Sequence, residues 1–307
     1  METNIQKNAK VGILTFESFY GKQNIGSSRI RGHWLAKYWD EAEIFKMGRQ
    51  YDVIIFQKVY WIEYAKKIRE HYPDTIMILD LCDADFLHWG YRIVQMIGYC
   101  DAVTTSTLEL AKFIINLTDK PVWCIADRLD LESFDALPAK THAGNGDAKI
   151  AAWFGYSENF PMLDGAIMSL IKLGFKELIV IASRKQPYQL PATAQGKIQL
   201  TNYPWSPETV NADLQRADIV LNPQSKTGRF KYKSNNKTIT AWALGLPVAA
   251  DVDDLKALIP EEARINEAIK RMAEVHEIYD VKQSVEEFKN LIAQIQKTRA
   301  GFSKKEI

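Results

Sequence analysis

The sequence has few cysteines, no long apolar run and no excess of charge of either sign. Its three cysteines, Cys82, Cys100 and Cys124, show no CxxC spacing, which argues against a disulfide framework or a zinc site. We therefore expect reduced core thiols. No stretch approaches the ~20 apolar residues that cross a bilayer. The polar start METNIQKNAK lacks the apolar segment of a signal peptide, so we expect a cytoplasmic protein without a membrane span.

The charge balance excludes a strong global field. Lys and Arg number 39, Asp and Glu number 38, and the formal net charge is +1. This balance argues against a nucleic acid partner, although net charge does not exclude a local basic patch. A hydrophobic content of 47% and a charged content of 25% are typical of a globular protein. At 307 residues, two domains are expected.

The first half alternates short apolar runs with segments whose apolar residues recur at helical spacing. This alternation is typical of a parallel sheet flanked by helices. The expected strands are 11–16, 52–57, 75–81, 101–106 and 121–126, and the expected helices are 28–39, 61–72 and 107–117.

The same alternation resumes after a polar stretch, 139–149, which we interpret as a linker. The sequence thus predicts an α/β protein with two Rossmann-like, doubly wound domains facing a cleft, at 1–140 and 148–280, and a C-terminal helix, 281–307, that can pack back on the first domain. Ligands are expected at the carboxyl ends of the strands. The expected strands are 150–155, 177–183, 197–203, 218–223 and 247–251, and the expected helices are about 161–173, 207–216, 235–244, 261–278 and 281–295.

A basic loop followed by a helix start is the most informative segment. Its helix begins near Ser234 or Asn235, residue types whose side chains accept bonds from unpaired helical NH groups. Such a terminus attracts an anion, phosphate in particular. The segment favours a diphosphate site, although a solvated loop before an ordinary capped helix explains any single lysine. The basic residues are Lys226, Arg229, Lys231, Lys233 and Lys237.

The run from DIVLNP (218–223) to TAWALGLPVAA (240–250) resembles the nucleotide-sugar-binding segment of GT-B glycosyltransferases. WFGYSEN (153–159), CDAVTTSTLELAKFI (100–114) and CIADRLDLESF (124–134) are similar to other segments of that family. The resemblance implies a hexosyltransferase-like enzyme that moves a sugar from a nucleoside diphosphate sugar to an acceptor hydroxyl. It places the donor in the second domain and the acceptor in the first. It implies no cofactor beyond the sugar nucleotide, and no metal.

The sequence departs from the two-glutamate motif of many retaining members. Tyr232 and Thr240 stand where the glutamates would be, so stereochemical outcome stays open. Trp205 is expected either to stack on the nucleotide base or to staple the following helix, with Ser206 as its cap. The donor-binding residues that we expect are Gly155, Ser157, Arg184, Trp205, Lys233, Ser234, Asn235, Asn236 and Lys237.

Two further segments are candidates for the acceptor side. In the fold that the sequence resembles, the loop 17–34 faces the cleft, which implies that Gly26, Ser27, Ser28 and Arg29 bind acceptor or donor phosphate. The alternative is a plain capped helix with Arg29 and Arg31 in solvent. The segment 80–89 follows a strand and offers groups that can receive the acceptor's proton. The catalytic candidates are Asp83, Asp85 and His88, whereas Asp80, inside the strand run, is expected to be structural.

The sequence is also compatible with other functions. A noncatalytic sugar-nucleotide-binding protein would bind donor without turnover. A phage-type nucleic-acid-base glucosyltransferase would need a basic surface, and an epimerase would need carboxylates that the loop 224–237 lacks. The donor nucleotide, sugar, acceptor and oligomeric state are not specified by the sequence.

Overall fold

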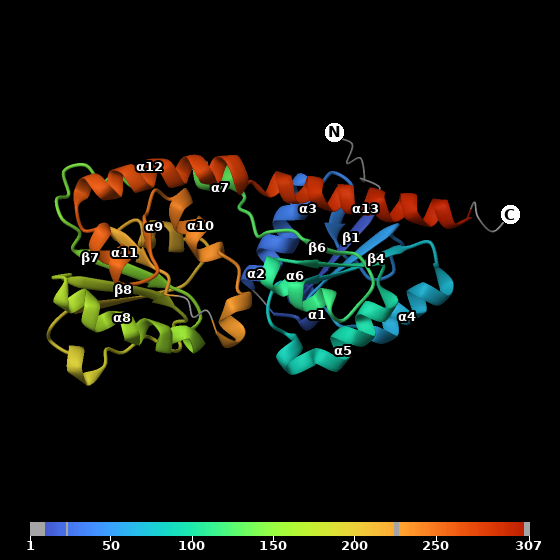
Figure 1. Cartoon of the computed structure of the whole chain (residues 1–307), viewed down its shortest axis with the longest axis horizontal. Helices are drawn as coiled ribbons and strands as arrows, with labels where there is room; N and C mark the ends of the chain where they lie inside the picture. Colours follow the sequence, from blue (N-terminus) through green and yellow to red (C-terminus); the bar gives the residue numbers. More distant parts are fainter. Residues whose placement is uncertain (1–9, 23, 224–226, 304–307) are drawn as a thin grey trace, which may run out of the picture. The chain divides into compact units, whose positions relative to one another are not determined.

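The computed structural model describes residues 10–22, 24–223 and 227–303, and of 301–303 only the backbone. The starting segment 1–9 and Lys226 therefore lie outside the described residues. The chain divides into two compact units (Figure 1). Unit 1 comprises Met1–Asp130, Lys231–Ser234 and Asp280–Ile307, and unit 2 comprises Leu131–Phe230 and Asn235–Tyr279. Both are α/β, as the sequence predicts.

Unit 1 contains a six-stranded parallel sheet in the order β2-β1-β3-β4-β5-β6. Alternate residues face opposite sides of a strand, so Ile54 and Phe56 enter one apolar core while Val53 and Ile55 enter another. Burial on both faces explains the continuous apolar runs in the sequence. The strands are β1 (Val11–Thr15), β2 (Ala42–Ile44), β3 (Val53–Gln57), β4 (Ile76–Leu81), β5 (Ala102–Thr105) and β6 (Val122–Cys124).

Helices cover both faces of this sheet. The expected helix 28–39 is a continuous helical run over 26–38 with a π-helical turn in its middle. Gly32 permits its close approach to β1, because a Cβ there would lie 2.3 Å from Thr15 Cγ2. Figure 1 shows α13 lying along α3. The ring centroids of Phe288 and Trp39 are 6.3 Å apart there. The helices are α1 (Phe16–Tyr20), α2 (Gly26–Ser28), η1 (Arg29–His33), α3 (Trp34–Tyr38), α4 (Ile62–His71), α5 (Phe86–Tyr99), α6 (Leu108–Ile115) and α13 (Val281–Ser303).

Unit 2 contains a five-stranded parallel sheet in the order β11-β10-β7-β8-β9. Its strands are β7 (Ile150–Phe154), β8 (Glu177–Ala182), β9 (Gln199–Pro204), β10 (Ile219–Leu221) and β11 (Val248–Ala249). The predicted linker 139–149 consists of turns, a bend and irregular backbone. The helical elements are α7 (Leu131–Asp135), η2 (Ser157–Asn159), α8 (Phe160–Lys172), η3 (Ala192–Ala194), α9 (Val210–Leu214), α10 (Asn236–Ala243), α11 (Val252–Ala257) and α12 (Glu261–Ile278). A further short helix, η4 (Gly228–Tyr232), begins in unit 2 and ends in unit 1.

The structure bears on the predictions about the cysteines and about membrane-spanning segments. Cys82 and Cys100 are buried, Cys124 is partly buried, and all three are free thiols. Of the helices in the described ranges, none is both long and apolar enough to cross a membrane.

Candidate functional site

A cluster of charged and phenolic side chains lies at the carboxyl ends of β3 and β4 in unit 1. Lys58 directly follows β3 with φ of 55°, a left-handed conformation that costs a non-glycine residue roughly 1 kcal/mol or more. Its Nζ lies 2.6 Å from Asp83 Oδ2 and 3.5 Å from Asp85 Oδ1. The Tyr60 hydroxyl donates to Asp85 Oδ2 at 2.7 Å. We call Lys58, Tyr60, Asp83, Asp85 and Lys233 the strand-end cluster.

The segment Lys231–Ser234 brings the last member of this cluster to unit 1. Tyr232 is 8% exposed and belongs to the unit 1 core, with its ring centroid 5.2 Å from that of Phe86. The aromatic residue that replaces a motif glutamate therefore fills an apolar position. Its neighbour Lys233 lies 3.6 Å from Asp83 Oδ1.

The electrostatics of the cluster fix the protonation of Asp83 and Tyr60. Partial burial opposes ionisation of Asp83, but Lys58 and Lys233 outweigh it and hold the pKa of Asp83 below its ordinary value. Burial and then Asp85 raise the pKa of the Tyr60 hydroxyl. At neutral pH, Asp83 is therefore an ionised carboxylate and Tyr60 a neutral donor. Two of the three predicted catalytic residues lie together here, whereas the His88 side chain is exposed on the first turn of α5.

A second polar network lies deeper in unit 1. Arg31 is 3% exposed and donates to both carboxylate oxygens of Asp80, at 2.8 and 2.6 Å. It also donates to Asp127 Oδ1 at 3.0 Å, and Asp80 accepts from Thr104 at 2.7 Å. The alternative that placed Arg31 in solvent is therefore wrong. Asp80 is fully buried within this network, as its position inside the strand run predicts, and its structural role stays a prediction. Ser234 joins this network by donating to Asp127 Oδ2 at 2.6 Å.

The predicted phosphate loop at 26–29 is partly engaged by the protein. The Ser28 side chain is fully buried and accepts from Glu17 N at 3.0 Å while donating to Gln57 Oε1 at 3.2 Å. The Arg29 guanidinium lies 5.6 Å from the Trp34 ring centroid. Gly26 and Ser27 are partly exposed. Ser28 thus connects the loop to β3, and Gly26 and Ser27 are the partly exposed members that a ligand can reach.

In unit 2, a lysine ammonium lies against a glycine at the end of β7. Gly155 has φ of 153°, and a Cβ there would lie 2.4 Å from Lys237 Nζ. This Nζ is also 4.5 Å from the ring centroid of Trp153, a cation–π distance. Lys237 belongs to the first turn of α10, so a cation, a helix N-terminus and a close-approach glycine meet at one place.

The start of α10 retains donors that an anion can use. Asn235 is the N-cap, as predicted, but its side chain makes no cap bond and instead donates to the Tyr279 hydroxyl at 3.0 Å. The first-turn amides are therefore not capped by Asn235. The Asn236 Nδ2 atom is buried and lacks a hydrogen-bond partner within the described part of the chain. A buried donor of this kind calls for a ligand or water.

The other predicted donor residues follow neighbouring strands of unit 2. Ser157 donates to Gln186, Arg184 is exposed after β8, and Trp205 is partly buried after β9. The Trp205 amide donates to Ala182 O at 2.7 Å. Ser206 accepts from Thr209 N at 3.2 Å, but α9 begins at Val210 with Thr209 as its N-cap, so Ser206 does not cap this helix as expected. The structure thus brings Gly155, Asn236 and Lys237 together, but Lys233 and Ser234 contact unit 1 carboxylates instead.

The chain is similar to solved sugar-nucleotide transferases. T4 phage BGT in complex with its UDP-glucose substrate aligns with a TM-score of 0.54 and 9% identity, covering 93% of this chain and 98% of that chain. The chain has the GT-B fold. An α-glucosyltransferase in complex with UDP and a 13-mer DNA containing an HMU base aligns with a TM-score of 0.51 and 11% identity, over 80% of this chain and 79% of that one. At these identities the likeness concerns the GT-B fold alone.

Other comparisons add little to the GT-B assignment. The chain spans 53% of the glycosylation-associated protein Gap123 from Streptococcus agalactiae, with a TM-score of 0.45 and 14% identity. No protein-family model matches the sequence, and no curated protein sequence matches it significantly.

Proposed function

We propose that this GT-B chain is a glycosyltransferase that moves a sugar from a nucleoside diphosphate sugar to an acceptor hydroxyl. The observation that carries the proposal is the position of Lys237 Nζ against Gly155, at the start of α10. A diphosphate bound there would accept bonds from first-turn amides and from the ammonium. The missing side chain at Gly155 leaves room for that ammonium, because a Cβ there would lie 2.4 Å from Lys237 Nζ. Asn236 Nδ2 would supply a further donor.

The same groups would assist the chemical step. As the glycosidic bond breaks, negative charge grows on the leaving diphosphate, and a fixed cation and helix terminus stabilise that charge. The acceptor hydroxyl must lose its proton as it attacks. We assign that proton to Asp83, because this carboxylate is ionised beside Lys58 and is 37% exposed, against 20% for Asp85. Lys58 and Tyr60 would position the two carboxylates.

No metal enters the proposed reaction. Within the described residues, no group of three or more His, Cys, Asp or Glu side chains is arranged to hold a metal ion. Independence from metal stays a prediction, and turnover with and without EDTA measures it.

A second candidate differs in the acceptor. T4 phage BGT aligns over 98% of its length, and the α-glucosyltransferase noted above was solved with DNA, which favours a hydroxylated nucleic acid base as acceptor. The net charge of +1 gives no overall electrostatic attraction toward a nucleic acid acceptor. Transfer of label from a sugar nucleotide to hydroxymethylated DNA, compared with unmodified DNA, tests it directly.

Donor binding is the first test of the proposed function. A ligand that binds only the folded state raises its melting temperature, so we expect UDP, ADP or GDP to raise Tm at millimolar concentration. If none of the three does, the transferase proposal fails. If a nucleotide binds but its sugar conjugates are neither hydrolysed nor transferred, the chain is a noncatalytic binder.

The assignment of Asp83 has its own test. Asp83→Asn should retain nucleotide affinity within about twofold and lose about 100-fold or more in turnover, in line with a positioned base. The control is Asp119→Asn, because Asp119 is exposed on the same unit outside the strand-end cluster. Equal turnover in the two variants would remove Asp83 from the mechanism.

A further inference from the structure

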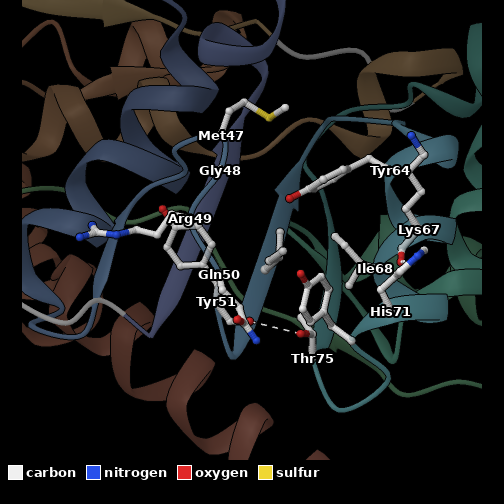
Figure 2. A pocket seen from close by; sticks show the side chains of 12 residues that line it. Met47, Gly48, Arg49, Gln50, Tyr51, Tyr64, Lys67, Ile68, His71 and Thr75 are labelled. Atoms are coloured by element: carbon white, nitrogen blue, oxygen red, sulfur yellow. Dashed lines mark hydrogen bonds between the residues drawn. The ribbon is translucent and has the colours of Figure 1, made fainter.

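A cavity of about 440 Å³ lies in unit 1 at the amino ends of β3 and β4 (Figure 2). It lies between the loop 47–51, which precedes β3, and one face of α4, and Thr75 closes it before β4. The strand-end cluster follows the carboxyl ends of the same strands, so the two sites lie at opposite edges of the sheet. The volume is in the range of small-molecule sites.

The inner surface of this cavity suits a flat apolar ring. Its floor includes Ile54 and Ile68, which are 3% and 4% exposed. Tyr51, Tyr64 and Tyr72 form aromatic walls, and Figure 2 shows the Tyr64 ring reaching from α4 toward β3. Aromatic walls over an aliphatic floor favour ring stacking and apolar contact.

The cavity is lined by basic and phenolic side chains, and the Glu43 carboxylate accepts from two of them, Tyr51 and Arg49. None of the 12 described residues that line it is acidic. Lys67 and His71, one turn apart on α4, are exposed at its rim. Arg49 is a third basic residue, but it pairs with Glu43 and points away from the cavity in Figure 2. Lys67 is therefore the main fixed charge available to a bound anion.

We propose that this cavity is a second binding site, for a small ligand that combines a flat aromatic ring with a carboxylate or similar anionic group. The ring would lie among the tyrosines and the anion beside Lys67. The site is independent of glycosyl transfer, because its residues belong neither to the strand-end cluster nor to the start of α10.

A model ligand tests this site directly. We would titrate the full chain with 2-naphthoate by calorimetry, and repeat the titration with the neutral 2-naphthylmethanol. Lys67→Glu should weaken 2-naphthoate about tenfold, since it replaces an attractive charge by a repulsive one. Lys66→Glu is the matched control: it makes the same charge change on α4, but Lys66 is outside the cavity lining and pairs with Glu70 at 3.8 Å.

The outcomes separate the site from the rest of the molecule. Support requires that Lys66→Glu binds 2-naphthoate like the parent chain, that the neutral analogue binds more weakly, and that Tyr72→Ala, at a 49% exposed position, also loses affinity. Lys237→Ala should leave this affinity unchanged whether or not the chain is a transferase. The proposal would be overturned if no binding were detected at about 5 mM ligand, a concentration that reaches weak sites. Equal affinity of Lys67→Glu and Lys66→Glu for 2-naphthoate would also overturn it.

Discussion

Replacing Lys237 by alanine is the sharpest perturbation of the proposed donor site. The ammonium lies against Gly155, 4.5 Å from the Trp153 ring centroid and 5.8 Å from that of Phe154, so its loss removes both cation–π contacts and one cation from the phosphate position. A hydrogen bond to a charged group contributes about 1.5–3 kcal/mol. Since 1.4 kcal/mol corresponds to a factor of ten in Kd, Lys237→Ala should weaken nucleoside diphosphate binding about 10- to 100-fold.

The fold should tolerate this change. A partly exposed cation–π contact contributes about 0.5–1 kcal/mol, and alanine recovers a few tenths through its helix propensity. We therefore expect a free energy of unfolding within about 1 kcal/mol of the parent chain, measured by urea denaturation. Calorimetric titration with the nucleotide that gives the largest Tm shift measures the affinity. Lys256→Ala, at an exposed lysine of α11 in the same unit, is the control. Equal affinities in the two variants would refute the reasoning.

Three other predictions concern single positions. Gly155→Ala should also weaken nucleotide binding, because its Cβ would lie 2.4 Å from the neighbouring ammonium. The strained φ should lower the free energy of unfolding by about 1–2 kcal/mol. Gly165→Ala, where a Cβ meets open space, should change neither nucleotide affinity nor stability in this way. Asp80→Asn removes the carboxylate charge that Arg31 contacts through two hydrogen bonds and leaves Asp127 as its remaining buried partner charge. Urea denaturation should therefore show a loss of about 3 kcal/mol, and a loss below about 1 kcal/mol would contradict the network's structural role. Partial burial works against the ionised form of Glu43, but its basic and phenolic partners prevail and lower its pKa to about 2. The ionised carboxylate therefore stabilises the fold above its ordinary pKa of 4.5, and this stabilisation is lost as pH falls toward 2. The difference in free energy of unfolding between the parent and Glu43→Gln, about 1 kcal/mol at pH 7 for such a pair, should shrink over that pH interval, and a constant difference would contradict the lowered pKa.

The elements that the sequence predicts best are those with a continuous apolar run. DVIIFQ became β3 because both faces of that strand are buried. The strand β2 was missed because its three residues, Ala42–Ile44, include a glutamate and give no period. The helix α5 was not delimited because Trp89 adopts non-helical φ and ψ inside it and because the large apolar side chains of Tyr91 and Val94 are exposed on its outer face.

The candidate site shows a similar division. Asp83 and Asp85 could be selected because carboxylates directly after a buried strand lie at the edge where ligands bind. Lys58 and Tyr60 were missed, since their partners are 25 residues away in the sequence and only the strand register brings them together. The same holds for Arg31, whose charge is compensated by a residue 49 positions along the chain.

The short segment Lys231–Ser234 belongs to unit 1 although the sequence on either side of it belongs to unit 2. Neither unit is therefore a contiguous stretch of sequence. A fragment ending at Asp130 would lack both Tyr232 and the α13 side chain Phe288, two aromatic rings of the unit 1 interior. Expression of residues 1–130 alone should accordingly yield an aggregation-prone polypeptide. A chimaera that exchanges unit 1 between related proteins would have to include the segment Lys231–Ser234 and the helix α13.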